Sequence, residues 1–269
     1  MAIVIDPISP VAFSVFGLDV RWYALAYIAA FIICFIMFRR MARRSDSGIV
    51  WTNAQYDDYL TAIILGVIIG GRLGYVLFYN LGFFMAHPIE ILAVWHGGMS
   101  FHGGLIGVII ANFLFGRHSH TSGWRLLDLC AVLAPIGLFF GRIANFINGE
   151  VMGRATDVPW AIVFNGDTPI PRHPSPLYEA TGEGIILFAI MFTLYKCTNM
   201  RKIPGVLSCT LGMLYAIIRI VCEMFRAPDA QIGFLTSWGL TMGMLLSSIM
   251  FIASALLCVH FVRKHRSEK

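Results

Sequence analysis

Residues 205–225 read G-V-L-S-C-T-L-G-M-L-Y-A-I-I-R-I-V-C-E-M-F. This stretch decides the fold class, because a helix of about 20 mostly apolar residues can cross the roughly 30 Å hydrocarbon core of a bilayer. Six further stretches of similar length and composition occur in the 269-residue chain. The seven predicted spans are 22–38, 59–79, 99–116, 126–146, 178–196, 205–225 and 238–262.

The composition of the whole chain supports a membrane protein. Hydrophobic residues make up 58% of the chain and charged residues 13%, against about 45–50% and about 25% in soluble domains. A soluble protein of this size leaves about a quarter of its surface in water, so it cannot bury this much apolar area. We therefore predict an all-α polytopic membrane protein, with residues 1–269 forming a single membrane domain.

The basic residues predict how the chain is oriented. Thirteen Lys and Arg residues follow the odd-numbered spans, and four lie in connections on the other side. The positive-inside rule then places the N-terminus outside and the C-terminus in the cytoplasm. This topology accounts for the net charge of +5, and no nucleic-acid partner is expected.

The longest polar connection, residues 147–177, joins the fourth and fifth spans on the predicted outer side. It is rich in glycine and proline, which predicts a folded loop built from turns. The dipeptide Asn148-Gly149 predicts that the fourth span ends there. We expect 147–177 to form a small outer head, whose turn residues include Gly166 and Pro169.

Three arginines lie inside predicted spans: Arg72, Arg142 and Arg219. Each costs about 2.5–3.5 kcal/mol near the middle of a bilayer unless its guanidinium meets a carboxylate, a water-filled cavity or an anion. Internal ion pairing is one interpretation, as for Arg219 and Glu223, which are four residues apart. The candidate carboxylates are Glu150, Glu179, Glu183 and Glu223.

A bound lipid phosphate is the other interpretation of these arginines. The second, fourth and sixth spans run in one direction, with Arg142 and Arg219 in the outer half and Arg72 nearer the middle. An outward-facing basic pocket would bind a phosphate well, because an arginine can donate two parallel hydrogen bonds to it. Both interpretations stay open on the sequence.

Other polar residues accompany these arginines. Tyr215, Arg219, Glu223 and Arg226 are spaced to line one face of a helix, which indicates a cavity or a hydrogen-bonded helix seam. His102 lies in the glycine-rich run W-H-G-G-M-S-F-H-G-G-L-I-G, residues 95–107. These glycines favour close helix packing, and the imidazole is either a proton carrier or a satisfied hydrogen-bonding group.

The densest polar cluster is G-R-I-A-N-F-I-N-G-E-V-M-G-R-A-T-D, residues 141–157. Its Asn and Glu side chains can orient a phosphate-binding arginine or bond lipid hydroxyls, and turn formation and capping are the alternative. Five further motifs accompany it. They are R-W-Y-A-L-A-Y from Arg21, G-G-R-L-G-Y-V-L-F-Y-N from Gly70, H-G-G-M-S-F-H-G-G from His96, R-H-P-S-P-L-Y-E-A from Arg172 and F-R-A-P-D-A-Q-I-G-F-L from Phe225.

With these motifs the chain resembles the bacterial prolipoprotein diacylglyceryl transferases over its full length. The resemblance implies a multi-pass protein of the bacterial inner membrane, with seven spans and an outer head. It implies transfer of the diacylglyceryl group of phosphatidylglycerol to the lipobox cysteine of a prolipoprotein signal peptide, releasing glycerol phosphate. The implied partners are phosphatidylglycerol, prolipoproteins and membrane lipids, and no metal or other cofactor is expected.

The resemblance also implies which residues act. The implied catalytic residues are His102, Arg142, Tyr215 and Arg219. The implied phosphatidylglycerol-binding residues are Tyr23, Arg72, Arg142, Asn145, Glu150, Gly153, Arg219, Glu223 and Arg226.

Within this set we expect Arg142 and Arg219 to stabilise the departing phosphate. We expect His102 to be the general base, although the arginines could instead lower the pKa of the attacking thiol. A transporter and a lipid-binding subunit remain as alternatives, although no inverted repeat supports a transporter.

Overall fold

The computed structural model describes residues 2–6, 8–164, 170–228, 233–237 and 239–268. Gly166 and Pro169 of the predicted head, and residues 229–232 of the motif from Phe225, lie outside the described residues. The chain divides into two compact units. The central unit is Arg39–Leu129, and the terminal unit is Met1–Phe38 together with Cys130–Lys269.

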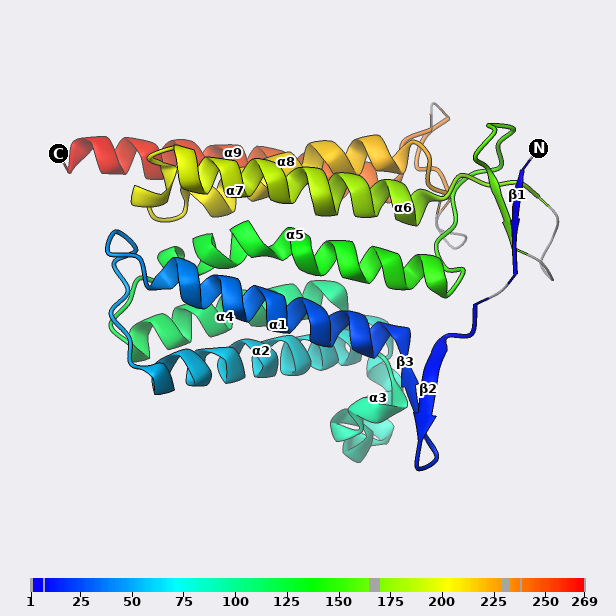
Figure 1. Ribbon diagram of the computed structural model, residues 1–269, viewed down its shortest axis with the longest axis horizontal. Helices are drawn as coiled ribbons and strands as arrows, with labels where there is room; N and C mark the ends of the chain where they lie inside the picture. The colour runs from blue at the N-terminus through cyan, green and yellow to red at the C-terminus, as the bar shows by residue number, and fades with distance from the viewer. Residues whose placement is uncertain (1, 7, 165–169, 229–232, 238, 269) are drawn as a thin grey trace. The chain divides into compact units, whose positions relative to one another are not determined.

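The central unit is built on two long helices that lie side by side, α2 (Asn53–Tyr79) and α4 (Phe101–His118) (Figure 1). Each begins at a hydroxyl residue that caps its free N–H groups. The Thr52 side chain caps α2, and the Ser100 side chain caps α4. Three short helices connect the two: α3 (Leu81–Ala86), η1 (Pro88–Leu92) and η2 (Val94–His96).

Glycines let the backbones of α2 and α4 approach closely. A Cβ atom on Gly66 would lie 2.7 Å from the carbonyl oxygen of Gly107, and one on Gly74 would lie 2.7 Å from Cα of Gly103. Any larger residue would therefore force the helices apart. The predicted close packing is confirmed for Gly103 and Gly107, whereas Gly97 forms a turn with φ of 83°.

The terminal unit contains the other long helices. In it α8 (Val206–Glu223) and α9 (Met242–Ser267) lie side by side and run in opposite directions (Figure 1). Most of α1 (Trp22–Ala42) and of α5 (Gly123–Ile147) also belongs to this unit. Another helix is continuous through α6 (Ser175–Glu179), the π-helical η3 (Ala180–Ile186) and α7 (Leu187–Cys197), and the short η4 (Met200–Lys202) follows it.

Short strands order the polar segments of the terminal unit. β1 (Ile3–Ile5) pairs in parallel with β4 (Ile162–Phe164), and β2 (Val11–Val15) forms a hairpin with β3 (Leu18–Arg21). The chain is thus mostly helical rather than all-α, because backbone donors outside the helices pair as strands. The predicted end of the fourth span is confirmed, since α5 ends at Ile147.

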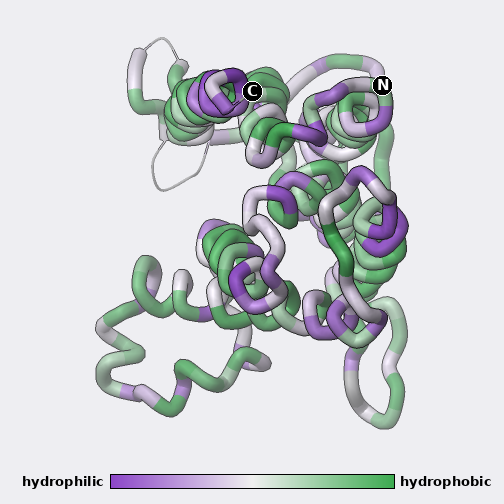
Figure 2. The backbone as a smooth tube through the Cα atoms, turned by 90° about the vertical axis from the view of Figure 1, so that its left-hand side faces the viewer, coloured by the Kyte–Doolittle hydropathy of each residue, from purple (hydrophilic) through white to green (hydrophobic). Residues whose placement is uncertain are grey.

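Among the described residues, six helices are long and apolar enough to cross a membrane. They are Trp22–Ala42, Asn53–Tyr79, Gly123–Ile147, Ser175–Cys197, Val206–Glu223 and Met242–Ser267. They coincide with six of the seven predicted spans, which confirms a multi-pass membrane protein. The remaining predicted span, 99–116, corresponds to α4, which has 18 residues and carries His102, Asn112 and Arg117 among its apolar residues. Figure 2 shows hydrophobic residues along the helices and hydrophilic residues at the C-terminal end of α9.

Candidate functional site

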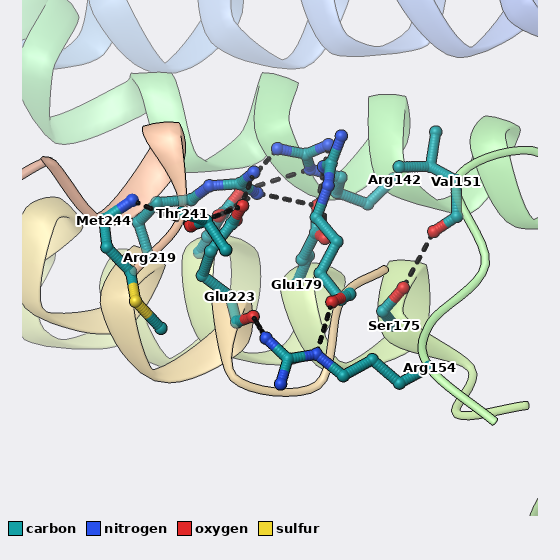
Figure 3. Close-up of polar contacts among 11 residues, drawn as sticks. Arg142, Val151, Arg154, Ser175, Glu179, Arg219, Glu223, Thr241 and Met244 are labelled. Atoms are coloured by element: carbon teal, nitrogen blue, oxygen red, sulfur yellow. Dashed lines mark hydrogen bonds and ion pairs between the residues drawn. The ribbon is translucent and has the colours of Figure 1, made fainter. Parts of the chain in front are cut away.

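Buried charged residues meet in the terminal unit where α5, α6, η3 and α8 come together. Figure 3 shows Arg142 from α5, Glu179 from α6 and Arg219 from α8 pointing toward one another. We call the whole group the arginine–glutamate cluster. Its members are Arg142, Glu179, Glu183, Arg219, Glu223 and Arg226.

Two glutamates hold both central arginines. Arg142 Nη1 lies 2.7 Å from Glu179 Oε2, and its Nη2 lies 3.0 Å from Glu183 Oε2. Arg219 Nη1 lies 3.2 Å from Glu179 Oε2 and 3.4 Å from Glu183 Oε1. The other terminal nitrogen of Arg219 lies 2.8 Å from Glu223 Oε2. This is the ion pair that one of the two interpretations of the sequence expected. Internal ion pairing therefore describes both arginines in this structure.

The burial of the cluster is uneven. The side chains of Glu179 and Glu183 are 0% exposed, whereas those of Arg142 and Arg219 are 18% and 12% exposed. The two carboxylates lie one helical turn apart and face the same side of their helix. The exposed surface of the cluster therefore belongs to Arg142 and Arg219 rather than to these two carboxylates.

The C-terminal end of α8 departs from the predicted stripe. The helix ends at Glu223, so Arg226 is not on the helical face shared by Tyr215, Arg219 and Glu223. The chain turns at Met224, and the backbone of Arg226 pairs with that of Gly153. Arg226 still joins the cluster, because its Nη1 lies 3.5 Å from Glu179 Oε1.

A threonine ties Glu223 to the next helix. Thr241 Oγ1 donates a hydrogen bond to Glu223 Oε1 at 3.2 Å and accepts one from the backbone N–H of Met244 at 3.2 Å. Thr241 is thus both the N-cap of α9 and a partner of the cluster (Figure 3). One side chain couples the start of α9 to the charge of Glu223.

A second polar group joins α1 to the chain that follows α5. Asn145 Nδ2 donates hydrogen bonds to Tyr23 Oη and to Glu150 Oε2, the latter at 3.2 Å. Asn148 Nδ2 donates to the other Glu150 oxygen at 3.3 Å. The structure thus brings together three predicted binding residues, which we call the Tyr23–Asn145–Glu150 triad.

The backbone beside this triad is unusual. Val151 has a left-handed φ of 60°, a rare conformation for a β-branched residue. Its carbonyl oxygen accepts a hydrogen bond from Ser175 Oγ at 2.8 Å (Figure 3). Gly153 follows at a point where a Cβ atom would lie 2.7 Å from the carbonyl oxygen of His173. Gly153 is therefore required by the close crossing of two backbone segments.

The arginine after that glycine supports the end of α8. Arg154 Nε donates to the carbonyl oxygen of Arg226 at 2.9 Å, and its Nη2 donates to that of Glu223 at 3.3 Å (Figure 3). Tyr215 lies on α8 one helical turn before Arg219.

The other two predicted residues belong to the central unit. His102 is the second residue of α4. Arg72, on α2, donates only to backbone carbonyl groups. Arg72 therefore makes a different kind of site from the arginine–glutamate cluster.

Comparison with known proteins agrees with these motifs. The family model described as prolipoprotein diacylglyceryl transferase matches residues 10–260. The chain belongs to this family. A relative from Rhodospirillum rubrum is 50% identical over 253 residues, which cover 94% of this chain and 92% of the relative. One from Azospirillum brasilense is 49% identical, with 92% of each chain covered. A third, from Geobacter sulfurreducens, is 46% identical, with 96% of each chain covered.

All three relatives carry the name phosphatidylglycerol–prolipoprotein diacylglyceryl transferase. The family's sequence pattern did not by itself assign every residue of the site. The sequence indicates Glu179 and Glu183 as candidate carboxylates without a specific role, and it does not indicate Thr241. The signal that could have assigned Glu179 and Glu183 to the site is their spacing, because two glutamates four residues apart in an apolar run face the same side of a helix. Thr241 gives no such signal, because its role depends on how α9 begins beside α8.

Proposed function

We propose that this chain transfers the diacylglyceryl group of phosphatidylglycerol to the thiol of a prolipoprotein lipobox cysteine. In this reaction a sulfur–carbon bond forms and the carbon–oxygen bond to the phosphate breaks. The thiol loses its proton, and glycerol phosphate leaves with the bonding electrons. Family membership supports the reaction type, and this is the first step of lipoprotein maturation.

The observation that carries this proposal is the uneven burial of the arginine–glutamate cluster. Arg142 and Arg219 are 18% and 12% exposed, whereas Glu179 and Glu183, which pair with both arginines, are fully buried. Glu223, the third partner of Arg219, is 7% exposed. A phosphate would approach the guanidinium groups, where preorganised donors stabilise the growing charge of the leaving group. The ion pairs keep both arginines charged and oriented before the lipid arrives, so internal pairing and phosphate binding are compatible.

The Tyr23–Asn145–Glu150 triad fits the lipid head group. Its hydroxyl, amide and carboxylate can bond the free hydroxyls of the glycerol that carries the phosphate. Tyr215, Glu223 and Arg226 would orient the arginines or the phosphate from α8 and the turn after it. His102 would take the thiol proton, or the cationic arginines would lower the pKa of the substrate thiol.

The membrane arrangement in this proposal has seven spans, with α4 as the third along the chain. The glycine contacts between α2 and α4 support it, since α2 is apolar enough to span the bilayer. Residues 147–177 then form a head on the outer face of the bacterial inner membrane. The Lys and Arg distribution supports an outer N-terminus and a cytoplasmic C-terminus.

The test uses the purified full chain in vesicles that contain phosphatidylglycerol, together with a peptide that has a lipobox cysteine. Mass spectrometry is expected to find a peptide heavier by one diacylglyceryl group. Vesicles of phosphatidylethanolamine, and a peptide with serine in place of the cysteine, are the controls. Lipid retention without peptide modification would replace this proposal with a lipid-binding subunit, and solute flux without modification would replace it with a transporter.

A further inference from the structure

Arg72 is saturated by backbone carbonyl groups. A guanidinium has five N–H donors, and each donor of Arg72 has its own acceptor. The acceptors are the carbonyl oxygens of Glu90, Ile91, Ala93, Gly97 and Gly98. A phosphate could accept a hydrogen bond from Arg72 only if one of these hydrogen bonds to a carbonyl group broke. Arg72 is also only 5% exposed.

Two glycines and an aromatic ring form the surroundings of the Arg72 guanidinium. Gly97 and Gly98 have φ of 83° and 79°, which only glycine adopts readily, and their carbonyl groups share Arg72 Nη1. The Phe84 ring centroid lies 5.0 Å from Arg72 Cζ, a cation–π distance. Within the described part of the chain Arg72 makes no ion pair, so the carbonyl dipoles and the ring balance its charge.

The same turn leads directly into α4 and His102. The backbone N–H of Ser100 donates to the carbonyl oxygen of Gly71 at 2.9 Å, next to Arg72 on α2. The Ser100 hydroxyl then accepts from the backbone N–H of Gly103 at 3.2 Å. His102 lies between these two contacts in sequence, so the position of its backbone depends on the turn that Arg72 holds.

We propose that Arg72 is a positioning residue for His102 and not a ligand of the lipid phosphate. It holds residues 90–98 in one conformation and so sets where α4 begins and where the imidazole points. A lysine cannot replace it, because an ammonium has three donors and no planar fork. This inference rests on the proposed function, since it assigns His102 a part in the transfer reaction.

The experiment is a double-mutant cycle measured by the transfer assay on the full chain. Arg72→Lys is expected to lower kcat by roughly 10–100-fold, because small displacements of a reacting group have effects of this order. The KM for phosphatidylglycerol is expected to stay within about twofold, since no phosphate contact is lost. In a His102→Gln background, Arg72→Lys is expected to cause no further loss, because coupled residues are not additive.

A rise in KM with unchanged kcat would assign Arg72 to the phosphate and overturn the inference. An equal loss of kcat in both backgrounds would also overturn it, as would full activity in His102→Gln alone. Absence of transfer by the unmodified protein would instead refute the proposed function, so the two failures are distinguishable.

Gly98→Ala tests the same turn without changing Arg72, should the lysine variant fail to fold. A Cβ atom there would lie 2.5 Å from the Tyr75 ring, so the turn must shift. The Gly98→Ala variant is expected to have a lower kcat and an unchanged KM for phosphatidylglycerol. A wild-type kcat in this variant would contradict the inference. Arg125→Lys is the matched control, because Arg125 also donates to a backbone carbonyl, that of Ser47 at 3.0 Å, and is expected to keep wild-type kcat.

Discussion

The arginine–glutamate cluster and the Arg72 turn are two ways of keeping arginine in an apolar helix. Arg142 and Arg219 are balanced by carboxylates, and their side chains stay 12–18% exposed. Arg72 is balanced by five carbonyl dipoles and is nearly fully buried. Under the proposed function, the difference is that the cluster arginines keep exposed surface for a phosphate, whereas every N–H group of Arg72 already has a carbonyl acceptor.

Replacing the imidazole of His102 is expected to give the largest effect. His102→Gln should lower kcat by about 10²–10⁴-fold if His102 is the general base. The measurement is the rate of peptide modification at saturating phosphatidylglycerol. A His102→Gln variant with nearly full activity would contradict the role given to the Arg72 turn, because the turn would then position no reacting group.

Arg142→Gln tests whether the arginine–glutamate cluster acts in the reaction. Loss of one preorganised donor should lower kcat by about 10²–10³-fold, measured in the same assay. Arg44→Gln is the control, because Arg44 pairs with Asp46 on the surface, at 43% exposure, where such pairs contribute little. Equal activities of the two variants would mean that the cluster only stabilises the fold.

The glycine contacts of the central unit predict a stability effect of intermediate size. Gly66→Ala places a methyl group 2.7 Å from the carbonyl oxygen of Gly107, and overpacking of this kind costs about 1–3 kcal/mol. Thermal unfolding in detergent should show a lower Tm. Gly82→Ala, with nothing within 4 Å of its Cβ position, should keep the wild-type Tm. If the two variants unfold alike, the helices are not packed through these glycines.

Thr241 predicts the smallest effect. Thr241→Val removes the N-cap of α9 and the hydrogen bond to Glu223, and loss of an N-cap costs about 0.5–2 kcal/mol. Thr241→Ser keeps the hydroxyl and should behave like the wild type in thermal unfolding. Equal stability of the valine and serine variants would show that this hydroxyl does not support the cluster.

The parts of the fold that the sequence predicted depend on local chemistry. Apolar runs of sufficient length located the membrane helices, and Asn148-Gly149 located the end of α5. Helical spacing indicated the pair Arg219–Glu223 as one of two interpretations, and the structure contains it. Each of these features is decided within a few residues along the chain.

The remaining features depend on contacts between distant segments. The partners of Arg72 are backbone carbonyl groups, which every residue carries, so no side-chain pattern indicated them. The spacing of Arg226 fits the helix that carries Arg219, but α8 ends at Glu223 and the backbone of Arg226 pairs with that of Gly153. The parallel pairing of β1 with β4 joins segments more than 150 residues apart, beyond the reach of local patterns.

The left-handed backbone of Val151 has a consequence for substitution at this position. A left-handed β-branched residue costs of order 1–3 kcal/mol, and here it lies directly after Glu150 of the triad. Glycine at this position would relieve the strain while giving the Glu150 backbone more freedom. Under the proposed function, Val151→Gly is therefore expected to exchange backbone strain for a less fixed Glu150.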